Sequence, residues 1–308
     1  MIHDYENWTY DDENKILRIK RVEEIHKSMF IPFDTVFGKF CNEIEYKVII
    51  PDSVKLIDSA CFLHMSAKEY VLPNSINEIG SYVFANNAYL KVIQWPDSVK
   101  SISEHAFEDC NSLKEIVLPE GIEEICNYAF QRCKSLNTIS IPSTVSKVDL
   151  GAFGYCDMLR EISFSDSIRW IGSQAFEYCT HLEGIQLPEG LQSIGNYTFV
   201  DCFSLKTIFI PTTVETLGEN AFCLCQNLKE IYVPRALYGK YGGDNYFKSN
   251  TSAEVIPYDE PMNISTNTIA KPEIITTNTI ETTATPKREF KSFNGVIRTN
   301  LIANKKKK

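Results

Sequence analysis

The sequence predicts an α/β repeat solenoid of about nine 23-residue units, with a concave parallel β-sheet on one side and mostly short or irregular helical segments on the convex side. Two columns of residues that recur at a step of 23 predict this fold. The first column holds Pro73, Pro96, Pro119, Pro142, Pro188, Pro211 and Pro234. The second holds Phe84, Phe107, Phe130, Phe153, Phe176, Phe199 and Phe222. A fixed period of this length is typical of units that fold by stacking on their neighbours.

Residues 113–133 illustrate one unit. Leu113, Ile116 and Leu118 have the spacing of a short strand whose alternate side chains enter one core. Pro119 ends the strand because it cannot donate to the next rung of a ladder, and Phe130 closes the far side of the unit. One unit has too few inward side chains to form a core alone, so we expect successive units to share one.

A glycine column lies four residues before the phenylalanine column. It holds Gly80, Gly172, Gly195 and Gly218. If this slot requires a positive φ, the units with Ser103, Cys126 or Asp149 in it carry backbone strain.

The regular spacing divides the chain into a repeat body and a tail. The body covers residues 44–247 and ends in a C-terminal capping unit. From residue 248 to 308 the composition shifts to Thr, Asn, Ile and Pro, which predicts a flexible tail that ends in a lysine cluster.

Composition and charge exclude several function classes. No apolar run approaches the roughly 18 residues that a membrane-spanning helix needs. The first residues are acidic where a secretory signal is basic and then apolar, so no signal peptide is visible and the sequence by itself indicates the cytoplasm. The segment from Lys248 carries ten Lys/Arg and six Asp/Glu, so it is basic. The preceding residues carry the other 21 Lys/Arg and 34 Asp/Glu, so the repeat body is acidic. An acidic body disfavours nucleic acid as a partner. The terminal lysines can touch an anionic surface; they are Lys305, Lys306, Lys307 and Lys308.

The cysteines and histidines indicate no catalytic or metal site. Six cysteines form one more column of the repeat: Cys110, Cys133, Cys156, Cys179, Cys202 and Cys225. This spacing predicts parallel, buried, free thiols. The five histidines fall in unrelated columns, and no phosphate-binding, nucleophile or metal motif is present. We therefore expect no enzyme activity and no cofactor.

The repeat units resemble the leucine-rich repeats of the BspA-like family, which occurs in bacterial surface proteins and in some protist parasites. The matching segments are LPEGIEEICNYAFQRCKSLNTISIP, SDSIRWIGSQAFEYCTHLEGIQLP and LPEGLQSIGNYTFVDCFSLKTIFIP. The start, NWTYDDENKILRIK, is similar to the tryptophan-containing strand segment that caps such repeats, which makes residues 1–43 an N-terminal cap. The resemblance implies a right-handed superhelix that binds proteins, in many members for adhesion to host matrix proteins or other cells, and a cell-surface or secreted location.

The outward columns of the strands are the candidate binding surface. One column contains Glu69, Glu115, Glu161 and Glu230, and its neighbour contains Val117, Phe209 and Tyr232. Exposed aromatic anchors concentrate binding energy, so this surface is a candidate site for a protein ligand. The alternative is that Phe209 and Tyr232 pair with each other across strands and that the acids serve solubility. A lysine and arginine column just before the glutamates balances part of their charge.

The sequence thus favours a non-enzymatic protein-binding repeat protein. Two roles remain open, a surface adhesin and an intracellular scaffold or effector. An enzyme or enzyme subunit is the remaining alternative.

Overall fold

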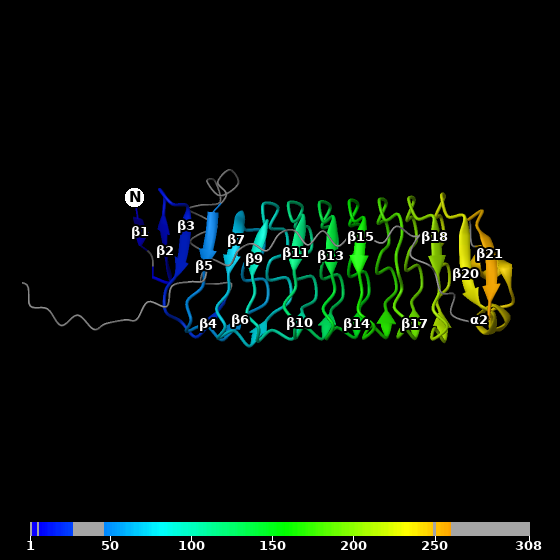
Figure 1. Ribbon diagram of the computed structural model, residues 1–308. Coiled ribbons are helices and arrows are strands. Elements are labelled where there is room, and N and C mark those ends of the chain that lie inside the picture. Colours follow the sequence, from blue (N-terminus) through cyan, green and yellow to red (C-terminus); the bar gives the residue numbers. More distant parts are fainter. Residues whose placement is uncertain (1, 5, 27–45, 249–250, 260–308) are drawn as a thin grey trace, which may run out of the picture. The chain divides into compact units, whose positions relative to one another are not determined.

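The computed structural model describes residues 2–4, 6–26, 46–248 and 251–259 (Figure 1). Residues 260–308, with the expected tail and its lysines, lie outside the described residues, as does the segment 27–45 of the expected cap. The described residues form a stack of coils, and the strands of successive coils line up in two rows, one of longer and one of shorter strands. The predicted repeat solenoid with parallel strands is therefore confirmed.

The longer strands form three sheets. The first contains β1 (Ile2–Asp4), β2 (Trp8–Asp11), β3 (Ile16–Ile19), β5 (Tyr46–Ile49), β7 (Ala67–Val71) and β9 (Val92–Gln94). The second contains β11 (Glu115–Val117), β13 (Thr138–Ser140) and β15 (Glu161–Ser163). The third contains β18 (Thr207–Phe209), β20 (Glu230–Pro234) and β21 (Glu254–Tyr258). From β3 onward, neighbouring strands are parallel.

The second row consists of two-residue parallel strands. They are β4 (Glu24–Ile25), β6 (Leu56–Ile57), β8 (Glu78–Ile79), β10 (Ser101–Ile102), β12 (Glu124–Ile125), β14 (Lys147–Val148), β16 (Trp170–Ile171), β17 (Ser193–Ile194) and β19 (Thr216–Leu217). The rest of each coil is built from turns. The helices of the described residues are α2 (Arg235–Lys240) and α3 (Asp244–Phe247), both at the C-terminal end of the stack.

The phenylalanine column forms a buried spine along the stack. Each ring from Phe62 to Phe222 stacks on the next, with centroids 5.2 to 5.9 Å apart. Backbone bonds follow the same axis, as in Phe130 N–H to the Ala152 carbonyl at 2.8 Å. The shared core therefore runs through every coil, as the period predicted.

The cysteine column packs beside this spine. All six thiols are buried and free, and each S–H donates to the carbonyl of the phenylalanine 26 residues earlier, as Cys133 does to Phe107 at 3.1 Å. The predicted row of buried thiols is confirmed.

The glycine column does not have a positive φ. The left-handed residues instead lie two and six positions later in each coil, for example Tyr197 and Asp201 after Gly195. Glycine occupies the slot because the coils approach closely there: a Cβ on Gly218 would lie 2.2 Å from the carbonyl carbon of Gly195. The expected strain from a positive φ at Ser103, Cys126 and Asp149 is therefore wrong.

Both ends of the stack are closed. At the N-terminal end, β1, β2 and β3 pair antiparallel, and Trp8 is fully buried beneath them. At the C-terminal end, β21 adds a strand beside β20, with Ala253 and Val255 in the core. The sequence predicted a flexible tail for residues 248–308, yet β21 lies within this range. The strand forms there because Ala253 and Val255 supply the inward side chains of one further coil.

Candidate functional site

The candidate site is the strand side, which we define as the outward face of the longer strands from β5 to β21. Side chains alternate in and out along each strand, so the outward residues of successive coils form columns across this face. The sequence placed seven candidate residues there: Glu69, Glu115, Val117, Glu161, Phe209, Glu230 and Tyr232.

Phe209 and Tyr232 lie together at the C-terminal end of the strand side. They are register partners on β18 and β20, and their rings stack with centroids 4.1 Å apart and planes 9° apart. The Tyr232 hydroxyl donates to Glu230 Oε2 at 3.3 Å. Partial burial, and then the Glu230 charge, raises the pKa of Tyr232. Both rings are half-buried, so they present a rigid aromatic surface with one carboxylate beside it.

Glu115, Glu161 and Val117 lie in the middle sheet. Glu115 and Glu161 flank Thr138 in register, and both carboxylates are exposed. Val117 is 84 % exposed, which is unusually high for an apolar side chain on a strand. Its neighbours in the same column are Ser140 and Ser163, so small polar side chains follow Val117 along this column.

Glu69 is separated from the other glutamates. It lies on β7 in the first sheet, where its Oε1 accepts from Lys47 Nζ at 2.7 Å and from Gln94 Nε2 at 2.9 Å. Its charge is thus locally satisfied. The structure divides the column of glutamates among three sheets. Glu69 lies in the first sheet, Glu115 and Glu161 lie in the second, and Glu230 lies in the third.

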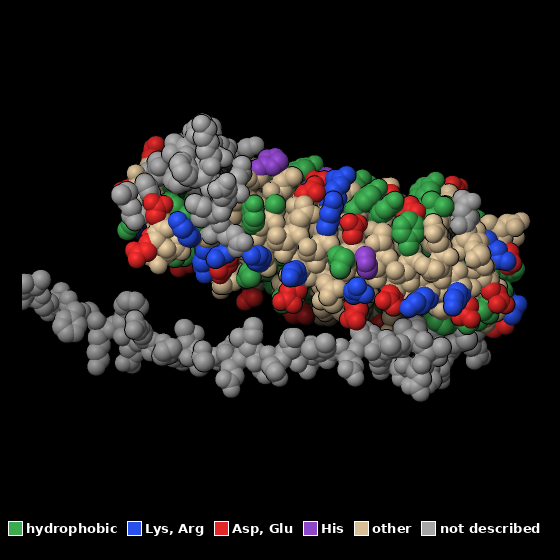
Figure 2. Space-filling model, turned by 90° about the horizontal axis from the view of Figure 1, so that it is seen from above, with side chains coloured by type: hydrophobic (Ala, Val, Ile, Leu, Met, Phe, Trp, Pro, Cys, Tyr) green, Lys and Arg blue, Asp and Glu red, His purple; other side chains and the backbone are tan. Residues whose placement is uncertain are grey.

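Positive and negative side chains alternate along the margin where the strands begin (Figure 2). Glu183 pairs with Lys206 at 2.8 Å and with Arg160 at 3.6 Å. The Lys206 ammonium is the main cause that lowers the pKa of the Glu183 carboxyl. The strand side is therefore a mixed-charge surface in which the apolar residues stand out.

Sequence reasoning missed a shallow hollow of about 510 Å³ at the start of β11 and β13. It is lined by Lys114, Glu115, Ser135, Asn137, Thr138, Met158 and Arg160. Met158 is 40 % exposed there. Met158 stands in the turn before a strand, at a position where other units carry the polar residues His181 and Ser204. An apolar residue at this polar position is the sequence signal that could have predicted the hollow.

The described residues offer neither a metal site nor a helix that could span a membrane. Residues 2–4, 6–26, 46–248 and 251–259 contain no group of three or more His, Cys, Asp or Glu side chains arranged to hold a metal ion. Among the same residues, neither the length nor the apolar character of any helix suffices to cross a membrane.

The stacked coils and the open strand side define a leucine-rich repeat protein. The model of the BspA type leucine rich repeat region matches residues 34–160 and 149–276, with 6 copies of the repeat. The chain belongs to this family, whose members are typically non-enzymatic binding proteins. A comparison with curated proteins gave no match.

Solved structures of bacterial leucine-rich repeat proteins are similar to the chain. The leucine rich repeat protein of T. pallidum, TpLRR, is 21 % identical over 82 % of this chain and 96 % of its own, with a TM-score of 0.47. A leucine rich cell surface protein from Faecalibacterium prausnitzii is 20 % identical over 85 % of this chain and 96 % of its own, with a TM-score of 0.34. The pneumococcal vaccine antigen PcpA is 15 % identical over 85 % of this chain and 99 % of its own, with a TM-score of 0.34.

Proposed function

We propose that this protein is a non-enzymatic recognition protein that binds a protein ligand through the strand side. The observation that carries the proposal is the stacked pair of Phe209 and Tyr232, whose centroids lie 4.1 Å apart on an open sheet face. Aromatic side chains that are already held in place lose little conformational entropy on binding and are frequent centres of interface energy. The exposed Val117 extends the surface toward the middle sheet.

We further propose that the ligand is a matrix or cell-surface protein and that the role is adhesion. The membership of the BspA-type family supports this proposal. The mixed charges along the margin, such as Glu183 between Arg160 and Lys206, suit a polar rim around an apolar centre.

The test replaces Phe209→Ser and Tyr232→Ser together and measures binding to a panel of immobilised extracellular matrix proteins by surface plasmon resonance. The double variant removes two half-buried rings from the face but no core residue, so we expect it to fold. We expect its affinity to fall by at least about tenfold, in line with the loss of a hot-spot pair.

The matched control is Tyr197→Ser, which removes an exposed tyrosine from a turn far along the coil from the strand side. We expect the control to bind like the parent chain. Equal binding by the parent and the double variant, with all three chains folded by circular dichroism, would refute this placement of the site.

An intracellular scaffold is the second candidate function. The six cysteines of the cysteine column are all free thiols, and free thiols are easiest to maintain in a reducing compartment. Protease treatment of intact cells separates the two roles, because only a protein displayed on the surface is cut. Protection from the protease, with cleavage after lysis, would favour the scaffold and contradict the adhesin.

A further inference from the structure

One column of left-handed residues follows the spine along the turns of the coils. Consecutive members are Asp109, Arg132, Tyr155, Tyr178, Asp201 and Leu224, and every one of them has a φ between 58° and 61°. We call this the outer turn column. Because the residues share one backbone conformation at a step of 23, side chains from neighbouring coils lie next to one another.

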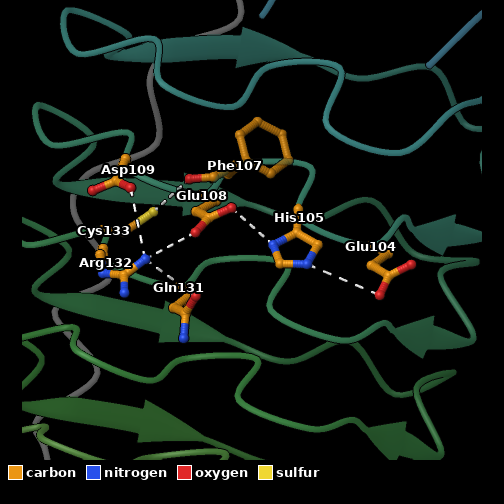
Figure 3. A network of polar contacts seen from close by, with 8 residues as sticks. All are labelled: Glu104, His105, Phe107, Glu108, Asp109, Gln131, Arg132 and Cys133. Carbon is orange, nitrogen blue, oxygen red and sulfur yellow. Dashed lines mark hydrogen bonds and ion pairs between the residues drawn. The ribbon is translucent and has the colours of Figure 1, made fainter. Parts of the chain in front are cut away.

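The first half of the outer turn column holds an arginine. Arg132 Nη1 lies 2.9 Å from Glu108 Oε1 and 4.0 Å from Asp109 Oδ2 (Figure 3). On its other side, the guanidinium carbon lies 5.7 Å from the centroid of the Tyr155 ring. The column thus already binds one guanidinium between carboxylates and an aromatic ring, by the chemistry that favours arginine over lysine.

The second half has the same kinds of group without the cation. The Tyr178 ring stacks on Tyr155 at 5.1 Å and meets Phe203 edge to face at 5.8 Å. The next residue in the column is Asp201, and its carboxylate forms no ion pair with a Lys, Arg or His among the described residues. Burial alone raises the pKa of Asp201, with no cation to oppose the rise.

This second half is open to solvent. Tyr178 is 37 % exposed and Leu224 is 40 % exposed. Hydrophobic side chains gather along this side of the stack, above the region of β15 to β18 (Figure 2). An unpaired, half-buried carboxylate beside exposed rings has the composition of a cation site.

We propose that Tyr178, Asp201, Phe203 and Leu224 form a binding site for an arginine side chain of a partner polypeptide. The guanidinium of the partner stacks on the aromatic surface and pairs with the Asp201 carboxylate. In the first half of the column, Arg132 likewise lies over the Tyr155 ring and pairs with Asp109. The site lies on the turns and is separate from Phe209 and Tyr232 on the strand side, so it does not depend on the function proposed above.

The charge of the turns favours a basic partner. The turn segments that carry the spine, 59–64, 81–86, 104–109, 127–132, 150–155, 173–178, 196–201 and 219–224, contain six acids and one base. The acids are Glu104, Glu108, Asp109, Glu177, Asp201 and Glu219, and the base is Arg132. Such a field raises the local concentration of cationic segments.

The experiment uses the full chain and three five-residue probe peptides, Ser-Gly-Xaa-Gly-Ser with Arg, Lys or Gln as Xaa, and measures dissociation constants by ligand-detected NMR. We expect the Arg peptide to bind more tightly than the Lys peptide, and the Gln peptide not to bind. Asp201→Asn removes the carboxylate charge with little change of shape. We expect this variant to bind the Arg peptide with an affinity about tenfold lower, which is the loss expected for one charge-assisted contact. We expect a similar loss for Tyr178→Ser.

The matched control is Glu219→Gln, which removes the same charge from an exposed turn residue outside the site. We expect it to change the affinity by less than about twofold, as for a screened surface charge. Equal losses for Asp201→Asn and Glu219→Gln would show only non-specific attraction and would overturn the proposal. Lys and Arg peptides of equal affinity would overturn the assignment to arginine.

A gain-of-site variant gives an independent readout. Arg132→Ser vacates the half-column at Glu108, Asp109 and Tyr155, so the folded variant should bind two Arg peptides where the parent binds one. A stoichiometry that stays at one would contradict the equivalence of the two halves. Circular dichroism checks that each variant keeps the strand signal of the parent.

Discussion

At the scale of single residues, the position of a thiol decides its chemistry. Cys133 and the other members of the cysteine column are buried, and burial raises their pKa well above the ordinary value. Cys126 stands instead in the glycine slot, where it is half-buried, and burial raises its pKa to about 11. A thiol reacts as the thiolate. We therefore expect Cys126 to be accessible to a thiol reagent but to react slowly, whereas the thiols of the cysteine column are inaccessible.

The prediction concerns labelling of the native protein by a thiol reagent. In a Cys41→Ser background, every remaining cysteine belongs to the described residues. Because the pKa of Cys126 is about 11, its thiolate fraction is small at pH 8 and rises with pH, so we expect one thiol to label about tenfold faster per pH unit between pH 8 and 10. Mass spectrometry of the labelled peptide identifies the site.

Cys126→Ser is the control and should abolish this phase. Under denaturing conditions all nine thiols of the Cys41→Ser chain should react quickly. Rapid native labelling of several thiols at pH 8 would contradict the packing of the cysteine column.

Single residues also show where sequence reasoning succeeds. The phenylalanine and cysteine columns were predicted because an inward apolar side chain repeats whenever its environment repeats. The reason for the glycine column was not predicted, because a repeated glycine has two possible physical causes, a positive φ or the close approach of two backbones. Only the position of the left-handed residues, such as Tyr197 two places after Gly195, separates the two causes.

At the scale of elements, the breaks between the three sheets have a visible correlate. The strand before each break, β9 or β15, is followed directly by a bulky aromatic residue, Trp95 or Phe164, where the other coils carry Leu, Ile or Val. Trp95 meets Phe107 edge to face at 5.6 Å, and Phe164 meets Phe176 at 6.1 Å. We infer that these rings widen the coil and weaken its pairing with the next one. Gly184, where a strand residue is expected, adds to the second break.

The sequence did not predict these breaks. Trp95 and Phe164 satisfy the apolar pattern as well as leucine does, and periodicity carries no information about volume. For the same reason the sequence placed the four glutamates in one column without showing that the column is divided among three sheets. Glu69 lies in the first sheet, where it accepts from Lys47. The aromatic pair of Phe209 and Tyr232 was correctly placed in one column, since both lie on paired strands without a break.

The last short strand, β19, is closed by side chains instead of by another strand. Leu217 N–H donates to the Tyr241 hydroxyl at 2.9 Å, and the Tyr246 hydroxyl donates to the Leu217 carbonyl at 2.6 Å. Lys240 Nζ donates to the Glu215 carbonyl at 2.8 Å. The tyrosines thus satisfy backbone groups that an open sheet edge would expose.

The prediction at this scale is that Tyr241→Phe together with Tyr246→Phe destabilises the chain. Each change deletes one hydroxyl and leaves a backbone group of Leu217 without its partner, so we expect a loss of about 2 kcal/mol in the free energy of unfolding. Urea denaturation followed by circular dichroism measures it.

Tyr238→Phe is the matched control. Its hydroxyl donates to the part-exposed Asp244 carboxylate at 3.0 Å, which water can replace, so we expect a loss below about 0.5 kcal/mol. Similar losses for the control and the double variant would mean that the hydroxyls do not close the edge of β19.

At the scale of the whole molecule, stacking of equivalent units leaves its two long faces free for different roles. The strand side carries mixed charges with an aromatic pair at one end, whereas the turns carry six acids and one arginine in the spine segments. The repeat predicts both faces, because it fixes which positions point inward. It does not choose the ligand, since the outward positions contribute little to folding and vary freely from coil to coil.

The same independence predicts that one whole coil can be removed. Deletion of residues 143–165 takes out 23 residues and joins Pro142 to Asp166, which restores the P-D-S pattern found at Pro51 and Pro96. Every column stays in step, and Phe130 becomes the stacking partner of Phe176. We therefore expect a folded, shorter stack that melts in a single transition.

Deletion of residues 143–153 removes 11 residues and turns inward side chains outward, so this control should unfold or aggregate. If both deletions unfold the chain, the coils are not interchangeable, and stability depends on contacts that a nearest-neighbour stack does not contain.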